Sequence, residues 1–187
     1  MRWIPFVILA YLVVLMQTTL GRFLTFTTAG IGSIGPDLIA MVAVFVAFYV
    51  RNWVDGMLAA WVLGLVVDLT TGGAAAAGTV IGPMPIAYAL AAGLLFRVRE
   101  ALFRERALTQ ALLAGGFCLL THGLWVTVQS LLAYDAMTWS AYGKTLLQAA
   151  ALAAYTAALM PLAHFALGKV QRWFLVAPVA AVRAGRR

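Results

Sequence analysis

Long apolar runs separated by short polar or charged segments dominate the chain. Six such runs lie at residues 3–20, 36–50, 54–69, 80–96, 107–133 and 146–167. A transmembrane helix needs roughly 20 apolar residues to cross a hydrocarbon core of about 30 Å. The pattern therefore predicts an all-α integral membrane protein, in which residues 1–187 form a single polytopic membrane domain with a bundle of six transmembrane helices.

The fourth run begins less regularly than the others. Gly82, Pro83 and Pro85 interrupt its start, and the small residues of 72–78 precede it. Glycine and proline at this density are typical of turns or of re-entrant segments. The fourth run is therefore expected either as a full span or as a segment that begins re-entrant. If two helices merge or re-enter, the number of spans falls to four.

Composition excludes a soluble domain. Hydrophobic residues make up 64% of the chain, charged residues only 10%, and the mean hydropathy is +0.97. A soluble domain carries about 25% charged residues. The net charge of +7 does not indicate nucleic-acid binding, because the basic residues adjoin apolar spans, where they act as orientation signals.

The basic residues are distributed very unequally between the two sides of the predicted bundle. Only Arg22 and Lys144 fall on one side, whereas 11 fall on the other. Those 11 are Arg2, Arg51, Arg97, Arg99, Arg104, Arg106, Lys169, Arg172, Arg183, Arg186 and Arg187. An excess of Lys and Arg marks the cytoplasmic side. Both termini are therefore expected in the cytoplasm, and an even number of spans follows.

Residues for catalysis or metal binding are sparse. The chain has no HExxH, GxSxG or phosphate-binding loop motif, so we expect no enzyme activity, no cofactor and no metal. His122 and His164 stand alone on predicted helices, and each is expected to be satisfied by one partner or to face a pore. A proton relay is the alternative, because ionisable residues within a membrane usually face protein or water. Cys118 is the only cysteine, which excludes an internal disulfide.

The third run carries a pattern of small residues that ends in a carboxylate. Gly56, Ala60, Gly64 and Asp68 recur every four residues and so share one helix face. The three small residues are predicted to serve helix packing. Asp68 lies near the outer edge of the hydrocarbon core and opposes the helix dipole. It therefore either has a structural or protein partner or is a solvated helix end.

Asp37 follows Pro36 at the outer start of the second run, where a carboxylate complements the positive end of the helix dipole. This helix-start chemistry accounts for Asp37 by itself. Arg22 is the nearest outer cation and is the candidate counter-charge for Asp37 or Asp68. We expect Asp68 to be the more consequential of the two carboxylates.

Four features occur in one chain order within residues 35–105: Gly-Pro-Asp-Leu at 35–38, an arginine and short turn at 51–56, Leu-Gly-Leu-Val-Val-Asp-Leu-Thr-Thr-Gly at 63–72, and the basic exit at 97–99. In these features the segment resembles the rod shape-determining protein MreD family of bacteria. The chain departs from the family after Gly72, where four alanines at 74–77 precede Gly78.

The resemblance implies a non-enzymatic scaffold of the cell-elongation machinery in the bacterial inner membrane. Its expected partner is an MreC-like single-span membrane protein and, through it, MreB and the peptidoglycan synthases. An alternative from another class is the substrate-binding subunit of an energy-coupling-factor vitamin transporter, which is similar in length and helix number. Those subunits often carry an Ala-x-x-x-Ala motif in the first span, where this chain has only Ala10. A membrane enzyme is a third and weaker interpretation, because clustered carboxylates and histidines are missing from the sequence.

Overall fold

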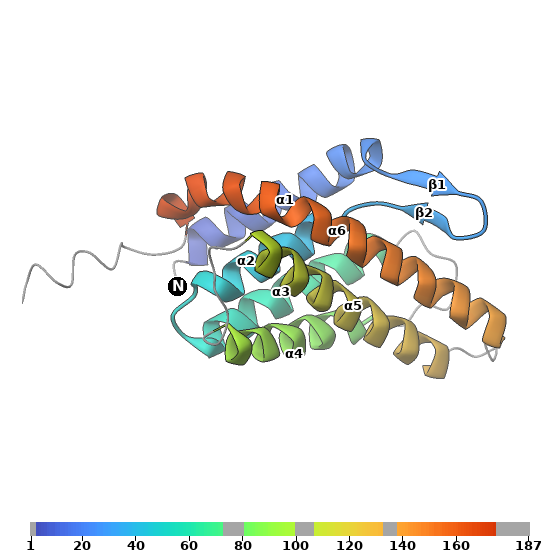
Figure 1. Cartoon of the computed structure of the whole chain (residues 1–187). Helices are drawn as coiled ribbons and strands as arrows, with labels where there is room; N and C mark the ends of the chain where they lie inside the picture. The colour runs from blue at the N-terminus through green and yellow to red at the C-terminus, as the bar shows by residue number, and fades with distance from the viewer. Residues whose placement is uncertain (1–2, 73–80, 100–106, 133–137, 175–187) are drawn as a thin grey trace, which may run out of the picture.

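A computed structural model describes residues 3–72, 81–99, 107–132 and 138–174. The described part is a bundle of helices with one short β-hairpin, and successive helices alternate in direction (Figure 1). The elements, in chain order, are α1 (Trp3–Phe23), β1 (Phe26–Thr28), β2 (Gly32–Ile34), α2 (Leu38–Tyr49), α3 (Trp53–Gly72), α4 (Pro83–Val98), α5 (Ala107–Leu132) and α6 (Trp139–Phe174).

The prediction of an all-α protein is confirmed, and each predicted span contains one helix. Four of these helices, α1, α3, α5 and α6, are long and apolar enough to cross a membrane, as expected of a multi-pass membrane protein. The other two, α2 and α4, are apolar but have only 12 and 16 residues. At about 1.5 Å per residue, α2 is about 18 Å long, well short of a hydrocarbon core of about 30 Å.

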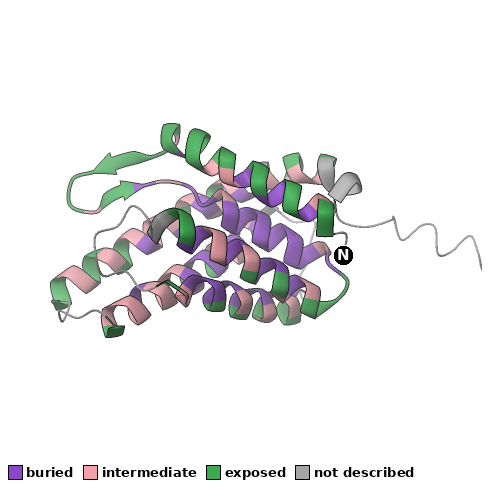
Figure 2. Ribbon diagram, turned by 180° about the vertical axis from the view of Figure 1, so that it is seen from behind, coloured by how far each residue is buried: buried purple, intermediate pink, exposed green. Residues whose placement is uncertain are grey.

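Helix α2 forms the centre of the bundle. All its residues from 39 to 48 are buried, and it packs against α1, α3, α4, α5 and α6. Its sequence, Ile-Ala-Met-Val-Ala-Val-Phe-Val-Ala-Phe over these positions, has no polar face. A helix that is apolar on every side belongs in a protein interior. Figure 2 shows this continuous buried helix between neighbours that are exposed on their outer sides.

The outer sides of the surrounding helices carry large apolar residues. On α1 these include Ile4, Val7, Ile8, Tyr11, Leu12 and Met16, all exposed. An apolar patch of this size is unusual on a soluble monomer, but it suits contact with lipid or with another membrane protein. The distribution of exposed residues therefore agrees with the membrane interpretation of the composition.

The β-hairpin between α1 and α2 was not predicted from the sequence. Phe26 pairs with Ile34 and Thr28 with Gly32 in antiparallel register. The turn uses Gly30 and Gly32, whose φ angles are +98° and +96°, a region that glycine adopts without steric cost. The side-chain amide of Gln148 on α6 donates to the Ser33 carbonyl at 2.7 Å. The hairpin is therefore attached to the end of the bundle that lies opposite the N-terminus (Figure 1).

Candidate functional site

A buried polar network surrounds the start of α2, where the chain enters the bundle interior from β2. Asp37 is the N-cap residue of α2, with extended backbone angles, and its Oδ1 accepts the Ala40 N–H at 2.8 Å. This is the helix-start role expected from the sequence. Pro36 lies just before the cap rather than within the first helical turn. The cap is also only part of what Asp37 does.

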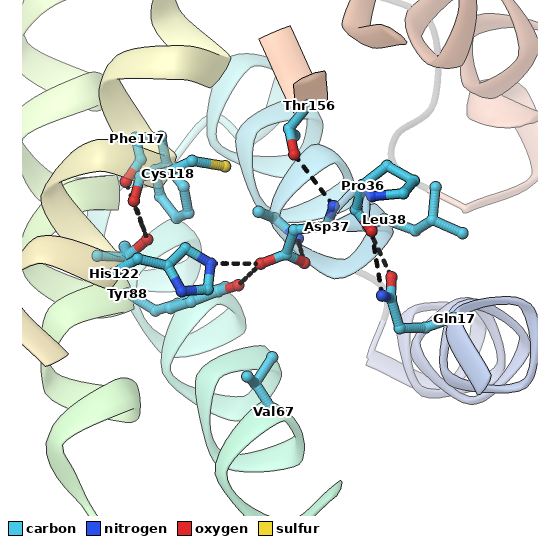
Figure 3. Close-up of polar contacts among 12 residues, drawn as sticks. Gln17, Pro36, Asp37, Leu38, Val67, Tyr88, Phe117, Cys118, His122 and Thr156 are labelled. Carbon is cyan, nitrogen blue, oxygen red and sulfur yellow. Dashed lines mark hydrogen bonds and ion pairs between the residues drawn. The ribbon is translucent and has the colours of Figure 1, made fainter. Parts of the chain in front are cut away.

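The second carboxylate oxygen of Asp37 joins α2 to two other helices. Its Oδ2 accepts the Tyr88 hydroxyl of α4 at 2.9 Å and lies 3.0 Å from Nε2 of His122 on α5 (Figure 3). Tyr88 is fully buried, and the side chains of Asp37 and His122 are largely buried. In such surroundings a charge is stable only when it is paired and hydrogen-bonded. Asp37 thus depends on both partners, and both are held in place by it.

The backbone beside Asp37 is satisfied by side chains from two further helices. Gln17 of α1 donates its amide N–H to the Pro36 carbonyl at 3.1 Å and accepts the Leu38 N–H at 2.7 Å. The Asp37 N–H donates to Oγ1 of Thr156 on α6 at 3.0 Å. Non-helical backbone at membrane depth is tolerated only where protein or water satisfies its polar groups. Gln17 and Thr156 meet that requirement, as Figure 3 shows.

A buried arginine caps the opposite end of α2. One guanidinium nitrogen of Arg99, Nη1, donates to the carbonyls of Ala47, Phe48 and Val50 at 2.9, 3.2 and 2.6 Å. The same guanidinium lies 3.5 Å from the centre of the Phe96 ring. The last carbonyls of a helix have no intrahelical donors and carry partial negative charge. Arg99, counted from sequence only as a topology signal, therefore caps α2.

Asp68 holds the start of α4. Its Oδ2 accepts the backbone N–H groups of Gly82 at 2.7 Å and Met84 at 3.3 Å. In the run Gly-Pro-Met-Pro at 82–85, the prolines have no N–H, so Asp68 takes both donors that this run offers. Asp68 is only 3% exposed. Of the two roles left open from sequence, this geometry corresponds to a structural partner rather than a solvated helix end.

Gly64 lies one turn before Asp68 and allows α4 to approach α3 closely. A Cβ added at Gly64 would lie 2.8 Å from the Met84 carbonyl oxygen and 2.8 Å from Cα of Pro85. Ala60 is buried on the same face, whereas a Cβ added at Gly56 would meet no atom within 4 Å. The packing role predicted for the three small residues thus has its most direct structural basis at Gly64.

Arg22 is not brought together with either carboxylate. It is exposed in the last turn of α1, and the interactions of the described residues pair Asp37 with His122 and Asp68 with backbone N–H groups. Protein donors thus take the role considered for Arg22. Three residues of this site were not predicted from the sequence: Gln17, Tyr88 and Thr156. The signal that singled out His122, a polar side chain within an apolar run, was present at all three.

The second histidine occupies a separate contact. Nε2 of His164 on α6 lies 3.0 Å from the Tyr49 hydroxyl at the end of α2. Each histidine thus has one side-chain hydrogen-bond partner, as expected from sequence. Within the described ranges, no three His, Cys, Asp or Glu side chains come together in a way that could hold a metal ion.

The hydrogen bonds of the Asp37 carboxylate link three helices of the bundle. The described donors already occupy both carboxylate oxygens, and the donors come from α2, α4 and α5. A carboxylate engaged in this way fixes the relative positions of the helices that contribute the donors. Comparison of the chain with protein-family models, curated proteins and solved structures gave no match.

Proposed function

We propose that this chain is a non-enzymatic scaffold of the MreD type in the bacterial inner membrane. In this proposal it binds an MreC-like single-span membrane protein and, through it, helps couple MreB to the peptidoglycan synthases. Two of the four features that carry the family resemblance contain Asp37 and Asp68. In the structure each of these carboxylates caps the start of a short helix within the bundle.

This use of the two carboxylates is the observation that supports the proposal most. A transporter subunit or an enzyme needs polar groups that are available to a substrate. Asp37 and Asp68 instead accept hydrogen bonds from the protein itself, and both are buried. A rigid bundle whose motif residues fix its own helices is suited to presenting a constant surface to a partner.

The proposal includes six crossings with both termini in the cytoplasm. The extended segment between β2 and Asp37 leads into α2 and lengthens the path of that short helix. Arg51, Arg97 and Arg99 gather at one end of the bundle, where Arg99 contacts the Val50 carbonyl. Arg22 belongs to the opposite end, beside the hairpin. This separation of basic residues supports the orientation inferred from the sequence.

Affinity purification from a rod-shaped bacterium tests the partner. The tagged full chain, extracted in mild detergent, should recover an MreC-like single-span protein, and depletion of the chain should make the cells round or swollen. Recovery of transporter ATPases, or vitamin-dependent growth of cells with normal shape, would overturn the proposal in favour of a transport subunit.

Cysteine labelling of intact cells tests the orientation. The native Cys118 is buried, so it should contribute little background. A membrane-impermeant thiol reagent should modify a cysteine at the exposed position of Ser140 and spare one at the exposed position of Arg51. The reverse labelling pattern would refute the proposed topology.

A further inference from the structure

Two grooves flank α4 on the outer surface of the bundle. The first, of about 480 Å³, lies between α3 and α4 and includes Trp53, Met57, Leu90 and Arg97. The second, of about 270 Å³, lies between α4 and α5 and includes Val98, Leu112 and Gly116. Leu94 lines both grooves and is 55% exposed, so it forms the ridge between them.

Both grooves lie in the half of the bundle that contains the end of α4. From Arg97 to Leu90 the first groove extends about 10 Å along the helix axis at 1.5 Å per residue. One leaflet contributes about half of a hydrocarbon core of about 30 Å, or roughly 15 Å. The length of the grooves is therefore comparable to the apolar thickness of one leaflet, and they lie at the end of the bundle that contains the α2–α3 turn.

An arginine and a tryptophan lie at the end of the first groove. Arg97 is exposed and has no hydrogen-bond or ion-pair partner among the described residues. Trp53 is exposed and lines the same groove, and tryptophan is enriched where membrane proteins meet lipid headgroups. Asp55, the acidic residue in the first turn of α3, does not line the groove. The chemistry of the groove is thus apolar along its length and positive at one end.

We propose that the two grooves bind one anionic phospholipid, with its phosphate at Arg97 and its two acyl chains on either side of Leu94. Charge selects the headgroup, since Arg97 has no carboxylate to neutralise it among the described residues. Shape selects a molecule with two chains, because one ridge separates two apolar grooves that end at the same level. Basic pockets between helices at the cytoplasmic side are a recognised form of anionic-lipid site.

Two variants test the contact with the headgroup and the contact with the acyl chains separately. Arg97→Gln removes the charge at an exposed position. Gly116→Leu fills the second groove without a backbone clash, because an added Cβ at Gly116 meets no atom within 4 Å. Arg22→Gln is the matched control, since Arg22 is an exposed arginine at the other end of the bundle. Thermal melting in detergent verifies that each variant is folded.

The measurement is native mass spectrometry of the full chain from nanodiscs of equimolar phosphatidylglycerol and phosphatidylcholine. The wild-type chain should retain one phosphatidylglycerol in preference to phosphatidylcholine. Arg97→Gln should lower this preference about five-fold, the effect of one basic residue near a membrane surface. Gly116→Leu should lower the retention of both lipids, and Arg22→Gln should match the wild type.

Three results would overturn the proposal. The first is an unchanged preference in Arg97→Gln, and the second is an equal loss in Arg22→Gln, which would indicate general surface charge. The third is unchanged lipid retention in Gly116→Leu, with or without loss of a co-purifying single-span protein or of a dimer. Such a loss would be informative about the true occupant, because it would assign the groove to a protein helix.

Discussion

Asp37 and Arg99 cap opposite ends of the same buried helix, although they lie 62 positions apart in the chain. The carboxylate lies at the positive end of the α2 dipole and the guanidinium at its negative end. Each charge therefore stabilises the backbone groups that α2 cannot satisfy internally. A short helix that is apolar on every side thus acquires fixed ends within the bundle.

Loss of the Arg99 cap should destabilise the protein. Arg99→Gln shortens the side chain and removes the charge that serves three carbonyls of α2. Hydrogen bonds to charged groups contribute about 1.5 to 3 kcal/mol, so we expect a loss of about 2 kcal/mol in the free energy of unfolding. Unfolding by sodium dodecyl sulfate in mixed micelles measures this change. The control is Arg97→Gln, two residues away and exposed, which should change stability by less than about 0.5 kcal/mol.

Replacing the two buried carboxylates should rank them, by loss of stability, in the opposite order to the one expected from sequence alone. Asp37 receives donors from Ala40, Tyr88 and His122, whereas Asp68 receives two N–H groups that both belong to the start of α4. We therefore expect Asp37→Asn to lower stability more than Asp68→Asn. Leaving a buried hydrogen-bond donor unsatisfied costs about 1 to 3 kcal/mol, and Asp37→Asn affects more donors than Asp68→Asn.

The abundance of each variant in the membrane and its unfolding in mixed micelles provide the comparison. Arg22→Gln, which removes a charge at an exposed position, is the control and should behave like the wild type. A larger effect at Asp68 than at Asp37 would mean that the start of α4 limits stability. In that case the hydrogen bonds around Asp37 would contribute less to stability than those of Asp68.

The sequence predicts the helices well because long apolar runs are a local property. It also predicts the cap at Asp37, since that contact joins residues three positions apart. It does not predict the contact of Asp37 with His122, which lies 85 positions away, or that of Gln17 with the backbone at Pro36. These contacts depend on how the helices pack, and apolar runs on six helices allow many arrangements.

The short length of α2 was not predictable from the sequence for the same reason, because it depends on contacts between distant segments. Its apolar run starts at Pro36 and looks like an ordinary span, yet the hairpin before it keeps the chain extended until Asp37. Three-residue strands in a segment rich in threonine and glycine give only a weak local signal. The polar side chains that satisfy this entry, Gln17 and Thr156, come from helices at the two ends of the chain.

A double-mutant cycle should show that Asp37 and His122 act as one unit. Asp37→Asn and His122→Gln each disrupt the contact between Oδ2 and Nε2 at 3.0 Å. The double variant should be less destabilised than the sum of the single variants, by about 0.5 to 3 kcal/mol. Unfolding in mixed micelles again supplies the free energies. A parallel cycle of Asp37→Asn with Thr127→Val, whose hydroxyl bonds Gly123 and Tyr142 instead, should be additive.

Glycine-to-alanine substitutions at two positions of one helix face should have different effects on stability. At Gly64 the new methyl group would lie 2.8 Å from backbone atoms of Met84 and Pro85, which cannot rotate away. Because inserting a methyl group into a packed interface typically costs about 1 to 3 kcal/mol, Gly64→Ala should destabilise the protein by that amount. The start of α4 would have to move off α3, and the hydrogen bonds of Asp68 to Gly82 and Met84 would lengthen with it.

At Gly56, two turns earlier, the same methyl group meets no atom within 4 Å. Alanine favours a helix over glycine by about 1 kcal/mol, so Gly56→Ala should be neutral or stabilising by up to that amount. Unfolding of both variants in mixed micelles compares the same substitution at two positions of one helix. Equal effects at the two positions would mean that close approach at Gly64 does not hold α4 in place, and that helix propensity alone governs this face.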